Sequence, residues 1–422
     1  MLNKQYFAKL LNIPIIKNVG VLVGGTAFSQ LIGLLALPIL TRLYTPEDFT
    51  VLATFSSILA LLTVVSCLRF EIAIPMPKKQ EIAMQLFLLS LISVFCITVL
   101  VTTALFIWEE YFDELTNNRL QGYYWLIPVG VFCAGFYKAL QYWMTREKKF
   151  KLVAKTRMTQ AVSGVAVQIG FGSFGLAPIG LLIGQILNSG AGVYGLLRDL
   201  IKSNKTLLFA FSFHDLKKTF KNYDRFPKVS TWEALFNSAG IQLPILIIAS
   251  LLIGEEAGFL MLAMRLLSAP LGLIGGSVSQ VYLSEASEKY HQGELRRFTI
   301  KAIFTLAKVG FLPLAAIGIL SPYLVPLVFG EEWQRSGILI SWMIPWFFIQ
   351  FIVSPVSMSL HICGLQKVAL TLQFLGFCMR SGGVFVTATF FTEWTGEVYS
   401  IISFLFYLLY LFTILKILRR MD

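Results

Sequence analysis

The chain has 422 residues, of which 56% are hydrophobic and only 14% are Asp, Glu, Lys or Arg. A soluble domain carries about 25% charged residues, so a water-soluble enzyme and a disordered scaffold are excluded, and much of the surface must face lipid. The formal charge of +12 indicates basic membrane loops rather than nucleic-acid binding.

Twelve apolar stretches are long enough to cross a bilayer as helices, which takes about 20 residues each. In chain order the predicted spans are 18–40, 50–67, 82–107, 123–144, 158–175, 176–197, 232–253, 258–283, 302–328, 337–361, 368–391 and 397–418. A tight turn from Gly175 to Pro178 is all that separates the fifth and sixth. The sequence therefore predicts an all-α integral membrane protein with about 12 transmembrane helices.

The basic residues orient these spans. With the N-terminus inside, the inner segments carry 28 of the 35 Lys and Arg residues, and the outer loops carry three, Arg42, Arg119 and Arg335. Because cytoplasmic loops are enriched in Lys and Arg, both termini are predicted to be cytoplasmic.

The longest inner loop, 198–231, divides the spans into six and six. We expect an N-terminal lobe (1–200), a basic cytoplasmic linker (201–231) and a C-terminal lobe (232–422). Phe213, Leu216, Phe220 and Tyr223 recur at helical spacing within the linker, which predicts an interfacial helix capped by Ser212 and ended at Pro227. The alternative is a plain solvated basic segment.

The two halves carry a short internal match. Leu37-Pro38-Ile39-Leu40 in the first span recurs as Leu243-Pro244-Ile245-Leu246 in the seventh, and an outer acidic pair follows each. Two six-helix lobes of the same orientation are related by a pseudo-two-fold axis along the membrane normal. A cleft between such lobes, open to one side and then to the other, predicts an alternating-access transporter.

Four basic residues fall inside the predicted spans: Lys138, Lys308, Arg265 and Arg380. A charge within the bilayer is costly, which makes each a candidate functional residue. Lys138 and Lys308 are near enough to an inner loop for snorkelling to explain them as well. Arg265 and Arg380 are predicted to line the cleft, and the alternative for both is burial against backbone carbonyls or glutamine.

These cations favour an anionic ligand. No Asp or Glu lies deep in a predicted span, and arginine grips phosphate oxygens in a bidentate fork. Amide side chains in the spans, among them Gln30, Asn237 and Gln242, add hydrogen-bonding groups for a hydroxyl-rich ligand. The cysteines and histidines show no metal-ligand spacing, so we expect no metal and no cofactor.

Several stretches resemble the bacterial polysaccharide (O-antigen) flippase family of the multidrug/oligosaccharidyl-lipid/polysaccharide exporter superfamily. The resemblance covers nearly the whole chain and is weakest at 100–125 and 380–400. It rests on Gly24-Gly25-Thr26-Ala27, on Leu37 to Phe49, on Leu68-Arg69-Phe70-Glu71-Ile72-Ala73-Ile74-Pro75, on Phe329-Gly330-Glu331-Glu332-Trp333 with Ser336-Gly337, and on Ser354-Pro355.

The resemblance implies two six-helix lobes in the bacterial inner membrane. It implies an undecaprenyl-diphosphate-linked oligosaccharide as cargo, moved from the cytoplasmic to the periplasmic leaflet for O-antigen and lipopolysaccharide synthesis. The implied partners are this lipid, the membrane lipids and other polysaccharide-assembly proteins, and no nucleic acid.

Three further residues occupy motif positions and are expected to act as a gate. Arg69 and Glu71 are expected to pair at the inner mouth, or else serve as ordinary loop anchors. Arg42 is expected to close the outer mouth, or else to anchor the first span at the headgroups.

Two rival functions differ in the residues that they need. A membrane polymerase or ligase needs an outer loop that carries its chemistry, and the longest outer loop, 108–122, has no histidine and no nucleophile constellation, so we predict that the chain is not an enzyme. An exporter of the same superfamily that carries another lipid or a drug is the closer alternative.

Overall fold

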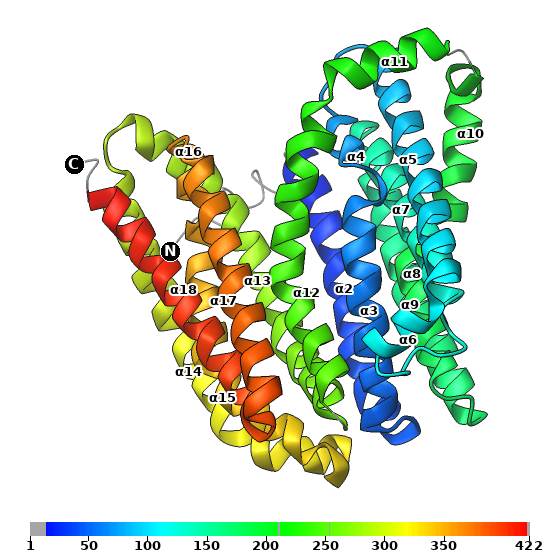
Figure 1. Ribbon diagram of the computed structural model, residues 1–422. Helices are drawn as coiled ribbons and strands as arrows, with labels where there is room; N and C mark the ends of the chain where they lie inside the picture. Colours follow the sequence, from blue (N-terminus) through cyan, green and yellow to red (C-terminus); the bar gives the residue numbers. More distant parts are fainter. Residues whose placement is uncertain (1–13, 210–211, 253, 420–422) are drawn as a thin grey trace. The chain divides into compact units, whose positions relative to one another are not determined.

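The computed structural model describes residues 14–209, 212–252 and 254–419, which are helical and contain no strand. The chain separates into two units (Figure 1). The N-terminal unit holds the residues up to Leu43 and Ile58–Leu235, and the C-terminal unit holds Tyr44–Ser57 and the residues from Phe236 onward.

Each of the twelve predicted spans coincides with a helix. In the first half these are α2 (Pro14–Leu43), α3 (Pro46–Ser66), α5 (Gln80–Ile107), α7 (Leu126–Arg146), α8 (Phe150–Ser173) and α9 (Ile179–Gly190), which α10 (Val193–Phe209) continues. In the second half they are α12 (Thr231–Leu251), α13 (Glu256–His291), α14 (Leu295–Phe329), α15 (Gln334–Val356), α17 (Gln366–Phe390) and α18 (Thr395–Arg419). Four shorter helices lie between them: α4 (Phe70–Ala73), α6 (Glu109–Leu115), α11 (Phe213–Asn222) and α16 (Met358–Ile362). The predicted fold, an all-helical membrane protein with six spans in each half of the chain, is confirmed.

The spanning helices differ in polarity. Among the described residues, nine helical segments are long and apolar enough to cross a membrane by composition alone. The predicted spans in α7, α8 and α13 fall outside this set, although all three helices are long enough to span. α8 shows why, because it carries Lys151, Lys155 and Arg157 in its first third. Polar residues in a membrane helix normally face protein or a water-filled space rather than lipid.

The linker contains the predicted amphipathic helix, now α11. The Ser212 side chain caps it by accepting a hydrogen bond from the His214 backbone N–H, at 3.3 Å. Leu216 is buried, and Thr219 Oγ1 donates to Gln85 Oε1 on α5, at 2.5 Å. The predicted end at Pro227 is wrong, because α11 ends at Asn222. Pro227 instead opens the π-helical turn Phe226–Ser230, where a proline is tolerated because the first N–H groups of a helix need no partner within it.

Large side chains and glycine contacts hold each unit together. In the N-terminal unit, Trp143 of α7 packs against Phe87 of α5, with ring centroids 5.8 Å apart. α8 and α9 approach closely at Gly184, where an added Cβ would lie 2.8 Å from the carbonyl oxygen of Gly164. In the C-terminal unit, α15 packs against α13, α14 and α18. Glycines such as Gly184 allow helices to pack closely in lipid, where the hydrophobic effect does not drive helices together.

The first half of α3 is part of the C-terminal unit. Phe49 is fully buried and lies edge-on against Trp333, with ring centroids 4.8 Å apart. Thr50 Oγ1 accepts a hydrogen bond from the backbone N–H of Gly258 at the start of α13, at 2.9 Å. One continuous helix therefore contributes to both units.

Some predictions concern residues outside this description. Residues 1–13 and 420–422, the two ends that are predicted to be cytoplasmic, lie outside the described residues, as does residue 253 at the end of the seventh predicted span.

Candidate functional site

A buried ion cluster formed by Arg69, Glu71 and Lys138 lies in the N-terminal unit. Glu71 on α4 is fully buried, with Lys138 Nζ of α7 at 3.1 Å and an Arg69 guanidinium nitrogen at 3.8 Å from its Oε1. The expected pairing of Arg69 with Glu71 is therefore present, and Lys138 joins it. Snorkelling is not needed to explain Lys138, because the lysine has a carboxylate partner inside the unit.

The backbone before α4 places this carboxylate. Leu68 and Arg69 both adopt left-handed conformations, with φ of 48° and 62°, between the end of α3 and the start of α4. A left-handed residue other than glycine costs about 1–2 kcal/mol, so the surrounding packing must hold it. That packing includes Phe70, which is fully buried and lies 5.5 Å from Phe220 of α11 between ring centroids. The linker helix thus supports the loop that carries Glu71.

Arg380 lies inside the C-terminal unit and is only 2% exposed. Its Nε donates to the carbonyl oxygen of Gly376 at 3.0 Å, and its guanidinium carbon lies 4.8 Å from the ring centroid of Phe406 on α18. Gly240 of α12 leaves room for it, since an added Cβ there would lie 2.8 Å from a terminal guanidinium nitrogen. Burial against a backbone carbonyl was the alternative for this residue, and the side chain makes that contact.

Lys308 lies on an exposed apolar face of α14. Phe304, Phe311 and Leu312 are 64%, 61% and 74% exposed and share that face with it at helical spacing. Such a face suits lipid, and a lysine there can extend its ammonium group toward the membrane surface. The geometry at Lys308 therefore agrees with the snorkelling alternative.

The other predicted site residues are spread over both units. Gln30, Gln242 and Arg265 are half-buried, whereas Arg42 and Asn237 are exposed. The Oε1 atom of Gln30 is buried and has no hydrogen-bond partner within the described part of the chain. Within the N-terminal unit, the structure brings together Arg69, Glu71 and Lys138 and places Gln30 on α2.

Two arginine contacts, one hydrogen bond and one ion cluster, were missed at the sequence level. Arg157 of α8 donates to Thr26 Oγ1 of α2 at 2.5 Å, although its place beside a basic loop suggested an ordinary inner residue. Arg335 of α15 was assigned to an outer loop, and it forms a second ion cluster with Glu256 of α13 and Glu397 of α18. The useful signal was the scarcity of outer basic residues, which makes each one a candidate partner for the many outer carboxylates.

The Arg335 cluster has bidentate geometry. Its guanidinium nitrogens donate to both carboxylate oxygens of Glu256, at 3.1 and 2.8 Å, and to both of Glu397, at 2.5 and 2.8 Å. A planar guanidinium matches two carboxylates in a way that lysine cannot. The cluster joins the N-terminal turns of three spanning helices and is a structural clamp.

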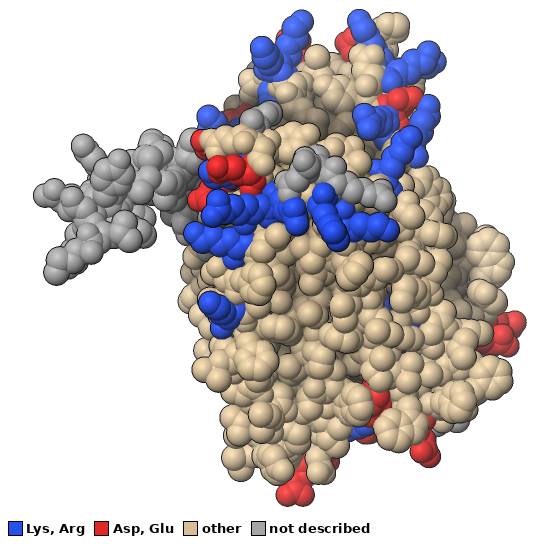
Figure 2. Space-filling model, turned by 90° about the vertical axis from the view of Figure 1, so that its left-hand side faces the viewer, with Lys and Arg blue, Asp and Glu red and all other residues tan. Residues whose placement is uncertain are grey.

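Charges are unevenly distributed on the surface. Figure 2 shows most Lys and Arg side chains toward one end of the face in view, together with some acidic ones, and mainly Asp and Glu at the opposite end. A broad band that consists almost entirely of uncharged residues lies between them. This pattern is typical of a membrane protein with a basic cytoplasmic side.

Three comparisons place the chain among known proteins. A family model described as "Polysaccharide biosynthesis protein" matches residues 39–337, which is more than half of the chain. Sequence comparison with characterised proteins gives no match. Among solved structures, a lipid II flippase MurJ in an inward closed conformation is similar, with a TM-score of 0.72 and 14% identity over 93% of this chain and 87% of that one.

Two structures of multidrug transporters share the fold at similar identity. An inward-facing MATE family transporter of the MOP superfamily has a TM-score of 0.59 and 14% identity, over 94% of this chain and 95% of that one. An outward-facing MATE family transporter of the MOP superfamily has a TM-score of 0.57 and 13% identity, over 96% of this chain and 95% of that one. The chain shares its fold with these structures, and the match over residues 39–337 shows that it belongs to the polysaccharide biosynthesis protein family.

Proposed function

We propose that this protein translocates an undecaprenyl-diphosphate-linked oligosaccharide from the cytoplasmic to the periplasmic leaflet of the bacterial inner membrane by alternating access. It is a multi-pass protein with both termini in the cytoplasm. The family match supports a role in polysaccharide synthesis, and the fold shared with a lipid II flippase supports movement of a lipid-linked sugar.

The charge of the spanning helices is the observation that carries the proposal. Lys138, Arg157, Arg265 and Arg380 lie within the spanning helices α7, α8, α13 and α17, and the middle of the spans carries no Asp or Glu in the sequence. A transporter of cations needs an intramembrane carboxylate for its cargo, whereas guanidinium and ammonium groups suit a diphosphate. The polyprenyl chain stays in the lipid, so only the headgroup has to cross.

We assign roles within this proposal. Arg265 and Arg380 neutralise the diphosphate during crossing, and Lys138 and Lys308 contribute positive charge from the inner side. Gln30, Asn237 and Gln242 bind sugar hydroxyls, and Gln30 offers an unpaired carbonyl oxygen for this purpose. Arg42, Arg69 and Glu71 act as gates.

The direct test is removal of the protein from its host, followed by analysis of lipid-linked sugars. Accumulation of the intact lipid-linked oligosaccharide on the cytoplasmic leaflet is expected. The second candidate, an exporter of another lipid or a drug, is favoured by the likeness to MATE structures. It predicts unchanged surface polysaccharide together with altered drug sensitivity or lipid composition.

Single substitutions test the anion site. Arg265→Ala and Arg380→Ala should abolish export. Arg265→Lys and Arg380→Lys should keep part of it, because lysine retains the positive charge but cannot bind phosphate in a bidentate way. Lys308→Ala is the comparison variant and should weaken export much less than loss of either arginine, since its lysine lies on an apolar exposed face. Protein level and thermal stability are measured for every variant. Wild-type polysaccharide from normally expressed Arg265→Ala and Arg380→Ala would show that both arginines are structural.

A further inference from the structure

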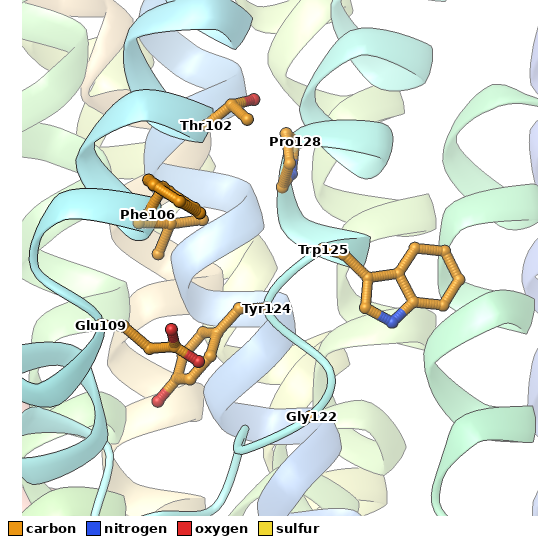
Figure 3. A pocket seen from close by; sticks show the side chains of 8 residues that line it. Thr102, Phe106, Glu109, Gly122, Tyr124, Trp125 and Pro128 are labelled. Carbon is orange, nitrogen blue, oxygen red and sulfur yellow. The ribbon is translucent and has the colours of Figure 1, made fainter.

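A cavity of about 280 Å³ lies in the N-terminal unit, between the end of α5 and the start of α7 (Figure 3). Leu105, Phe106 and Pro128 form an apolar part, and Glu109 and Tyr124 form a polar part at the α6 end. In Figure 3, Glu109 and Tyr124 lie beside each other, and Phe106 lies between this pair and Thr102 with Pro128. The cavity therefore matches an amphiphilic ligand, because its walls are apolar at one end and carry a charged side chain at the other.

The polar end has one available charge. The Tyr124 hydroxyl donates a hydrogen bond to Asp113 Oδ1 and forms a second hydrogen bond with Thr116 Oγ1, each at 2.8 Å. Glu109 is exposed, and no basic side chain of the described residues lies within salt-bridge distance of it. Its carboxylate can therefore accept hydrogen bonds from a cationic ligand.

The apolar end opens onto an exposed track. Phe95 and Val99 of α5 are 62% and 48% exposed, and Val129 and Phe132 of α7 are 43% and 39% exposed. On each helix these residues lie at helical spacing from lining residues, Phe106 on α5 and Trp125 at the start of α7, and so share their faces. Exposed apolar side chains along membrane helices face acyl chains, so a lipid tail fits this track.

We propose that this cavity binds a phospholipid with a primary ammonium headgroup. The lipid is one of the outer leaflet, because the predicted topology places the connection between α5 and α7 outside. The ammonium group donates to Glu109, and one acyl chain lies along the track between α5 and α7. Asp113 of α6, which accepts a hydrogen bond from the lining residue Tyr124, adds negative charge that repels an anionic headgroup. A quaternary ammonium headgroup has no N–H to donate, so it is a weaker ligand.

Two exposed tryptophans support this depth. Trp125 lines the cavity and Trp108 directly precedes Glu109. They are 57% and 58% exposed, and tryptophan is enriched at the membrane–water interface. The site is distinct from the proposed transport residues and does not depend on the identity of the cargo. Bound phospholipid would brace the outer ends of α5 and α7 against each other.

Lipid retention on the purified protein tests the proposal. The delipidated protein in detergent is mixed with equal amounts of dioleoyl phosphatidylethanolamine, phosphatidylcholine and phosphatidylglycerol, and bound lipid is counted by native mass spectrometry. The wild-type protein should retain phosphatidylethanolamine over phosphatidylglycerol by about two- to five-fold, as one ion pair near the surface permits.

Three variants separate the site from a general surface effect. Glu109→Gln should remove the preference, whereas Glu110→Gln changes an exposed carboxylate that does not line the cavity and should keep it. Thr102→Phe fills the apolar end and should lower phosphatidylethanolamine retention without a change of charge. Thermal unfolding checks that each variant is folded. Equal retention of the lipids by the wild type, an equal loss in Glu110→Gln, or wild-type retention by both Glu109→Gln and Thr102→Phe would each overturn the proposal.

Discussion

Glu71 is a fully buried carboxylate whose charge is balanced by two cations that reach the surface of the unit. Lys138 and Arg69 are 22% and 24% exposed, so they can be solvated, but Glu71 cannot. Loss of a cation should therefore cost more than loss of the carboxylate. A buried charge left without its partner destabilises a protein by about 3–5 kcal/mol.

A double-mutant cycle measures this coupling. Lys138→Met should lower the unfolding temperature strongly, Glu71→Gln should lower it less, and the double variant should recover much of the Lys138→Met loss. Lys228→Met removes one partner of an exposed pair with Asp224 and is the control, with an expected effect of about 0–1 kcal/mol. Additive losses in the double variant would show that Lys138 and Glu71 do not interact.

Glu255, between α12 and α13, gives a pH-dependent prediction. Burial and the carboxylates of Glu47 and Glu332 raise its pKa above the ordinary value, so the folded protein disfavours its charged form. The resulting penalty exists above the raised pKa and is relieved as the pH falls through it. Glu255→Gln should therefore raise the unfolding temperature at pH about 7.5, and the gain should vanish below the ordinary carboxyl pKa of about 4.3. Glu393→Gln, an exposed carboxylate, is the control, and a gain that persists in acid would contradict the electrostatic cause.

The position of single charged residues was only partly predictable. Arg69 and Glu71 are two residues apart, so their pairing followed from the sequence. The partner of Lys138 did not, because the contact spans 67 positions and depends on the turn that directs Glu71 into the unit. No acidic residue lies deep in a span, so the sequence showed no partner for the lysine, although α4 carries one inward.

Among the helices, α13, α15 and α18 are joined by the Arg335 cluster. Glu397 is nearly buried, so removal of the guanidinium leaves two carboxylates close together and poorly solvated. Arg335→Leu should lower the unfolding temperature at neutral pH, with a cost toward the lower part of the range of about 3–5 kcal/mol. The deficit should shrink as the pH is lowered, because protonation removes the uncompensated charges. Arg335→Lys should lie between the two, and a deficit that grows in acid would contradict the clamp.

The sequence predicted which segments are helices more accurately than it predicted where each helix ends. Apolar runs predicted all twelve spans, nine of which are apolar enough by composition alone among the described residues, because a bilayer-crossing helix must satisfy its backbone internally. The ends depend on local chemistry that a run does not show. α10 continues to Phe209 beyond the predicted sixth span, and Pro227 begins a turn instead of ending α11.

For the molecule as a whole, the arrangement of charges predicts the topology. Single cysteines at Asn117 and Glu393, both exposed, should react with an impermeant thiol reagent added outside intact cells. A cysteine at Lys218 on α11 should react only after permeabilisation. The native Cys96 and Cys378 are exposed on α5 and α17, so the parent protein is labelled in parallel as the background. Labelling at Lys218 in intact cells would reverse the predicted orientation.

At Arg69, one of two consecutive left-handed residues with Leu68, the backbone conformation is unfavourable but the side chain forms an ion pair with Glu71. Glycine adopts this conformation freely, so Arg69→Gly would relax the chain while removing the cation beside Glu71. The relief of about 1–2 kcal/mol is smaller than the cost of about 3–5 kcal/mol for a buried charge without its partner, so glycine in place of Arg69 should destabilise the protein. A stabilised variant is therefore to be sought at Leu68, where glycine relieves the same backbone conformation and leaves the charges in place.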